Sequence, residues 1–98
     1  MQEQKIEINI KEEIAHGIYS NLAIITHSNV EFIVDFVSVM PGIQKGEVRS
    51  RIILTPQNAK RLLNALGDNL RKFEEQNGEI KEIAHENIPI ITNNGGLA

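Results

Sequence analysis

One long amphipathic segment in the second half of the chain constrains the fold more than any other feature. It begins at Thr55-Pro56, where Thr can cap a helix and Pro fits the first helical position. Apolar residues then recur at spacings of three and four, as on one face of a helix: Ala59, Leu62, Leu63, Leu66, Leu70 and Phe73. Asn77-Gly78 supplies a stop signal. Because no second long helix is predicted, this one can cover only one face of a sheet.

Four shorter runs precede this helix and have the composition of β-strands. They comprise residues 5–10, 18–26, 31–40 and 47–55. The first alternates most clearly, with Ile6, Ile8 and Ile10 on one face. The later runs are joined by short turns, which suit antiparallel strands because parallel pairing needs long crossovers. The sequence therefore predicts an α+β fold: a four-stranded, mostly antiparallel meander covered on one face by one long C-terminal helix.

The chain has 98 residues, which is enough for one domain. We expect a single domain over residues 1–80, with its core in 5–80. The pattern weakens beyond Ile80, so residues 81–98 are predicted to form an extension that is partly extended or disordered.

Composition argues against several classes of function. The chain has no cysteine, which excludes disulfides and thiolate chemistry, and its net charge of −3 disfavours nucleic-acid binding. No apolar run approaches the roughly 20 residues of a membrane span. The three histidines lie in separate segments without ligand spacing. We therefore expect a cytoplasmic protein with no metal, no cofactor, no nucleic-acid partner and no membrane association.

The third and fourth runs predict their own register. With Asp35 opposite Arg51, a carboxylate meets a guanidinium and Ile33 meets Ile53. The same register places Val37 opposite Arg49. On the other face, apolar residues of the third run meet Leu54, Ile52 and Ser50; these residues are Phe32, Val34 and Phe36.

The second face of this predicted sheet carries a mixture of apolar and charged side chains. Since the single helix cannot cover it, we expect Ile33, Val37 and Ile53 to form an interface with a second copy of the chain.

Asp35 is the most unusual single residue, because it is a carboxylate inside an apolar run. One interpretation is a polar binding site, with the residues Tyr19, Asn21, Asp35, Arg49 and Arg51. The alternative, which we favour, is a structural pair between Asp35 and Arg51 that sets the register. No nucleophile elbow, phosphate loop or local triad is present, so no catalytic residue is assigned.

Several short strings together resemble a known family. They are Gly17-Ile18-Tyr19-Ser20-Asn21, His27-Ser28, Glu31-Phe32, Asp35-Phe36, Arg51-Ile52-Ile53-Leu54-Thr55-Pro56, Ala59-Lys60, Asn69-Leu70, Phe73-Glu74 and Gly78-Glu79-Ile80. This combination is similar to bacterial proteins of roughly 100 residues, the size of one domain, catalogued only as a domain of unknown function. That family often has Tyr where this chain has Phe73. The resemblance spans residues 17–80 and implies no activity.

The predicted order of strands and helix also resembles that of the bacterial export chaperone that holds unfolded precursors, although fold alone does not imply function. We expect a non-catalytic interaction or assembly module that forms a homodimer and has a protein or peptide partner. The alternatives are chaperone-like binding of extended peptide on the sheet and a small enzyme that uses Asp35 as its acid–base group.

Overall fold

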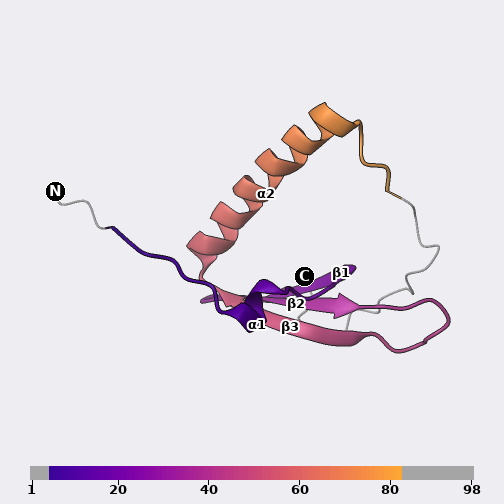
Figure 1. The fold of residues 1–98 in the computed structure, drawn as a ribbon. Helices are drawn as coiled ribbons and strands as arrows, with labels where there is room; N and C mark the ends of the chain where they lie inside the picture. The colour runs from indigo at the N-terminus through magenta and orange to yellow at the C-terminus, as the bar shows by residue number, and fades with distance from the viewer. Residues whose placement is uncertain (1–4, 83–98) are drawn as a thin grey trace.

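The computed structural model describes residues 5–82, which form two helices and three strands (Figure 1). In chain order the elements are α1 (Glu12–Ala15), β1 (Leu22–His27), β2 (Phe32–Ser38), β3 (Glu47–Leu54) and α2 (Pro56–Asn77). The strands form one antiparallel sheet in the order β1-β2-β3. The predicted α+β class, the antiparallel meander and the long C-terminal helix are confirmed.

The turn between β1 and β2 follows from its sequence. The Ser28 hydroxyl oxygen accepts hydrogen bonds from the backbone N–H groups of Val30 and Glu31, at 3.2 and 3.3 Å. The Ser28 N–H in turn donates to the Glu31 carbonyl at 2.9 Å. A serine side chain that bonds the nearby backbone in this way stabilises a tight turn, and the two strands it joins are therefore neighbours.

The register between β2 and β3 is the predicted one over most of its length. Asp35 lies opposite Arg51, Ile33 opposite Ile53 and Phe36 opposite Ser50. The predicted pairing of Val37 with Arg49 is wrong, because a β-bulge between Phe36 and Val37 places Val37 opposite Val48. A bulge adds one residue to one strand, and side-chain alternation alone does not reveal it.

The predicted strand at residues 5–10 is not formed, so the described sheet has three strands rather than four. Residues 12–15, just beyond that predicted strand, form the single turn of α1. Gly17 follows α1 with a φ of 78°, a value that favours glycine after a helix. The next strand therefore begins at Leu22 and not at Ile18.

Helix α2 begins and ends where its capping residues predict. The Thr55 hydroxyl oxygen accepts a hydrogen bond from the Asn58 N–H at 3.1 Å, and Pro56 occupies the first helical position. At the other end Gly78 has a φ of 89° and donates its N–H to the Glu74 carbonyl at 2.8 Å. Local sequence alone accounts for both ends.

The prediction that α2 covers a face of the sheet is wrong for the single chain. Figure 1 shows α2 rising at an angle from the end of β3, away from the strands. It touches the sheet mainly through β3, and none of its residues is buried. The five large side chains of its apolar stripe are between 44% and 70% exposed: Leu62, Leu63, Leu66, Leu70 and Phe73.

The core within the described residues is correspondingly small. Its buried hydrophobic side chains are Val34, Val37, Val39 and Leu54, which all lie on or directly after β2 and β3. Four buried side chains are a small core for one domain. The free energy gained by burying apolar surface only narrowly exceeds the cost of lost conformational entropy, so such a core leaves little stability. The predicted extension at residues 81–98 lies outside the described residues, apart from its first two.

The cap at Thr55 provides a test of the helix start. We expect Thr55→Ala to lower the free energy of unfolding by about 1 kcal/mol, because the Asn58 N–H loses its acceptor. Thr55→Ser keeps the hydroxyl and should change stability by much less. Urea unfolding at one fixed protein concentration measures both variants, and equal midpoints for Ala and Ser would contradict this role of the cap.

Candidate functional site

The two faces of the sheet differ in chemistry. The alternation of paired residues places Ile25, Val34, Phe36 and Ile52 on one face, here called the α1 face because α1 lies against it. The opposite face, here called the Asp35 face, carries Ile33, Asp35, Arg51 and Ile53. The α1 face is apolar, whereas the Asp35 face combines an ion pair with aliphatic side chains.

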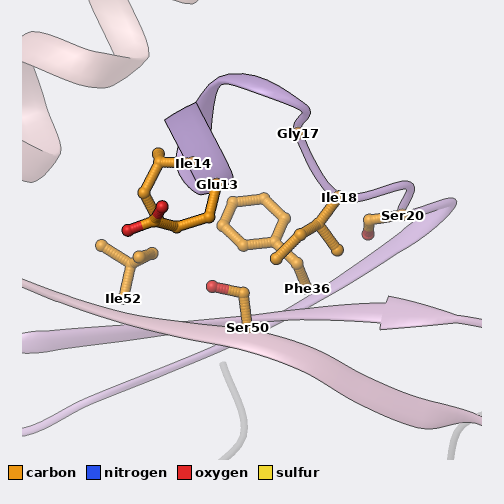
Figure 2. A pocket seen from close by; sticks show the side chains of 8 residues that line it. All are labelled: Glu13, Ile14, Gly17, Ile18, Ser20, Phe36, Ser50 and Ile52. Carbon is orange, nitrogen blue, oxygen red and sulfur yellow. The ribbon is translucent and has the colours of Figure 1, made fainter. Parts of the chain in front are cut away.

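An open hollow of about 460 Å³ lies on the α1 face, between α1 and the sheet. Figure 2 shows Phe36, Ser50 and Ile52 rising from the strands towards Ile14 and Ile18 of the segment above them. The remaining lining residues are Glu13, Gly17 and Ser20. Because most of this lining is aliphatic or aromatic, the hollow suits apolar side chains better than a polar or charged ligand.

The segment that roofs this hollow is attached to the sheet by short polar side chains. The Ser20 hydroxyl lies 3.0 Å from both the Leu22 and the Val37 carbonyl oxygens. The Asn21 side chain donates to the Val39 carbonyl at 2.8 Å and accepts from the Val39 N–H at 2.9 Å. Asn21, which the sequence suggested for binding, therefore uses both the N–H and the oxygen of its side-chain amide to hold this segment against the sheet.

Asp35 and Arg51 are the two predicted site residues that the structure brings together. The Arg51 Nε donates to one Asp35 carboxylate oxygen at 2.6 Å, and Nη2 donates to the other at 2.9 Å. The Asp35 side chain is 13% exposed and that of Arg51 is 60% exposed. Hydrogen bonding from Arg51 holds the pKa of the Asp35 carboxyl below its usual value, although burial acts in the opposite direction. Both carboxylate oxygens are satisfied by a two-point contact across adjacent strands.

The other two suggested binding residues lie elsewhere. Tyr19 is largely exposed, on the segment between α1 and β1. Arg49 lines a second hollow of about 340 Å³ beside the β2–β3 loop, and the other residues around that hollow are Ser38, Met40, Ile43, Lys45 and Glu47. Asp35 lines neither of these two hollows, and only Arg49 of the five suggested residues lines one of them.

The residues predicted as an interface are unequally accessible. Val37 is buried within the single chain, Ile33 is partly buried and Ile53 is 59% exposed. A larger apolar surface, which sequence reasoning assigned to the core, consists of the α2 stripe and the α1 face. Ile14 and Ile18 lie over the α1 face, across the hollow from the strands. Their spacing of four residues was the available sequence signal.

Within residues 5–82, no group of three or more histidine, aspartate or glutamate side chains is placed to hold a metal ion. No helix in this part of the chain is long and apolar enough to cross a membrane.

Comparison with protein families matches residues 1–82 to the family described as protein of unknown function (DUF3467). The chain belongs to this family. The match covers most of the 98 residues and includes the segment before Gly17, which the resemblance seen in the sequence did not reach. No curated protein and no solved structure matches the chain. Membership therefore assigns this chain to a family without adding an activity.

The ion pair predicts how stability depends on pH. Because the pKa of Asp35 is lowered in the folded state, from an unfolded value of about 3.9, the pair stabilises the fold above that pH. Its contribution is lost as the pH falls through the lower folded pKa. Asp35→Asn should lower the urea midpoint at pH 7 and flatten its decline below about pH 4.

Asp68→Asn is the matched control for this prediction, because Asp68 forms an exposed pair with Arg71 at 3.3 Å. We expect its effect at pH 7 to be small. Equal changes in midpoint for the two variants, measured by urea unfolding across pH 2–7, would contradict a structural role specific to Asp35.

Proposed function

We propose that this protein is a non-catalytic assembly module that acts as a homodimer. In this dimer the α2 stripe of each copy packs on the apolar α1 face of the other. The observation that carries the proposal is the exposure of the whole stripe: a 22-residue amphipathic helix has no buried residue in the single chain. Helices in proteins owe most of their stability to packing of such a face, so this helix needs a surface that residues 5–82 of its own chain do not provide.

The magnitudes support an interface that uses both surfaces. Full burial of a large apolar side chain is worth about 1.5–3 kcal/mol. The five large stripe residues are roughly half exposed, so their burial would contribute about 8–15 kcal/mol for two chains. Association costs about 4–15 kcal/mol. The free energy gained by burying the stripe alone is therefore close to the cost of association. The exposed isoleucines of the α1 face and of the segment over it have to contribute as well; these are Ile14, Ile18, Ile25 and Ile52.

A second copy is the partner that these surfaces favour. Each chain carries one unpacked apolar helix face and one open apolar sheet face. A two-fold arrangement uses both surfaces of both chains, and such dimers are the commonest oligomers. The interface first expected at Ile33, Val37 and Ile53 stays a prediction, with weaker support because Val37 is already buried.

The geometry of Asp35 supports the non-catalytic part of the proposal. An acid–base role would need this carboxyl to face a cavity that admits substrate. Instead, both of its oxygens bond Arg51, and Asp35 lines neither of the hollows described above. The structural pair that the sequence favoured is the arrangement found.

Leu66→Asp tests the dimer. We expect the wild-type chain to have about twice its 11.0 kDa mass in solution and the variant to dissociate, because a charge in the stripe cannot be buried unpaired. Asn64→Asp introduces the same residue on the polar side of α2 and should leave the dimer intact. Ile53→Asp should also leave it intact. Light scattering over micromolar concentrations measures all four masses.

A folded wild-type monomer would overturn this proposal. Dissociation by Ile53→Asp but not by Leu66→Asp would instead identify the Asp35 face as the interface.

A second candidate function is chaperone-like binding of extended peptide. It is favoured by the outer edges of β1 and β3, which pair with no other strand among residues 5–82. An added peptide strand bonds such an edge through its main chain. This function predicts that near-stoichiometric amounts of the protein slow the aggregation of several unfolded clients, as measured by light scatter. Absence of protection for every client would count against it.

A further inference from the structure

The segment before α1, residues 5–10, is here called the arm. Its three isoleucines, Ile6, Ile8 and Ile10, are 77%, 89% and 67% exposed. The arm belongs to no helix and no strand, and Figure 1 shows it drawn out and running away from the sheet. Three large β-branched side chains are thus largely exposed in a segment that is not buried against the rest of residues 5–82.

The arm nevertheless has the pattern of a strand. Isoleucine alternates with polar residues at period two, and β-branched side chains favour a pleated, half-buried surface. A surface loop has no physical need for this pattern. The arm therefore has the side chains of a strand that lies at a sheet edge, with its isoleucines on an apolar face.

The sheet offers a matching surface. With β2 in the centre, the outer edges of β1 and β3 have no strand partner among residues 5–82. An open edge with apolar neighbours exposes unpaired N–H and carbonyl groups and readily takes up another strand. One molecule thus contains both an unpaired strand-like segment and unpaired edges.

We propose that the arm of one copy adds as a fourth strand to the open edge of β3 in a second copy. This inference rests on the homodimer proposed above and specifies a second contact within it. The two-fold symmetry of such a dimer requires that both arms are exchanged. The fourth strand that the sequence predicts then forms between chains instead of within one.

The edge of β3 suits the arm better than that of β1. β3 has eight residues, against six in β1, so it offers the longer edge to the arm. Ile52 of β3 lies on the α1 face and is 42% exposed, which leaves apolar surface for the isoleucines of the arm to cover.

Charge also favours β3. When the isoleucines of the arm lie beside Ile52 on the α1 face, the alternate residues lie on the Asp35 face. Glu7 is then on the same face as the exposed guanidinium of Arg51. A carboxylate beside an arginine on a neighbouring strand is a favourable pair.

The position of α1 explains why a second copy receives the arm. The arm leads through Lys11 directly into α1, which lies over Phe36 and Ile52 of its own sheet. From there the arm runs outward, away from the sheet of its own chain (Figure 1). The six extended residues of the arm span about 20 Å, which sets how far away the β3 edge of a second copy placed against the α2 stripe can lie.

Nuclear magnetic resonance on the full chain tests this exchange directly. In the dimer we expect the arm amides that bond β3 to exchange with solvent on the order of 100-fold more slowly than in a free peptide. In a sample mixed from isotope-labelled and unlabelled chains, we expect contacts between the arm isoleucines of one chain and β3 of the other. Free exchange of the arm amides, contacts within one chain only, or contacts with β1 would each overturn the proposal.

Two variants separate this inference from the dimer itself. Ile8→Asp should raise the dissociation constant of the dimer about tenfold or more, because a buried side chain is lost. Asn9→Asp adds the same charge on the opposite face of the arm and should change it little. Suppose that Leu66→Asp dissociates the dimer, but that the arm amides of the wild-type dimer exchange freely with solvent. The swap of arms between chains is then wrong, and the proposed function stands. A wild-type monomer would overturn both.

Discussion

The pairing of β2 with β3 is the interaction on which the rest of the structure depends. Asp35 and Arg51 bond at two points across these strands, and the apolar pairs on either side agree with the same register. A slip of one residue would place Asp35 on the apolar α1 face and separate it from Arg51. We therefore expect the pair to act mainly through specificity of register, a role that buried polar groups have in some other proteins.

The end of β3 determines where α2 begins, and the direction of α2 determines which apolar surfaces stay exposed in the single chain. Thr55 and Pro56 follow Leu54 directly, so the helix starts where the strand ends. No loop allows the helix to fold back over the strands. Its apolar stripe consequently remains exposed among the described residues, and the proposed dimer is argued from this exposure.

Local features were predictable because their causes lie within a few residues. The Ser28 turn, the caps of α2 and the opposed pairs from Phe32 to Phe36 depend on neighbouring side chains or on simple alternation. The β-bulge after Phe36 was not predictable, because one extra residue leaves the hydrophobic pattern intact. The turn of α1 was missed because four residues are too few to show helical periodicity. Of the five suggested site residues, the structure brings only Asp35 and Arg51 into contact. Asn21 instead bonds the backbone of Val39, a contact that the alternation of side chains does not reveal.

The sequence by itself determined the class of the fold, the strand order of the meander, the register of its best pair and both ends of the long helix. Each of these depends on periodicity, on turn chemistry or on capping, which are properties of short segments. The tertiary structure decided what those segments pack against. Burial depends on the direction in which α2 leaves β3, and an amphipathic pattern states only that a face will be covered. It contains no information on whether the cover comes from the same chain or from another.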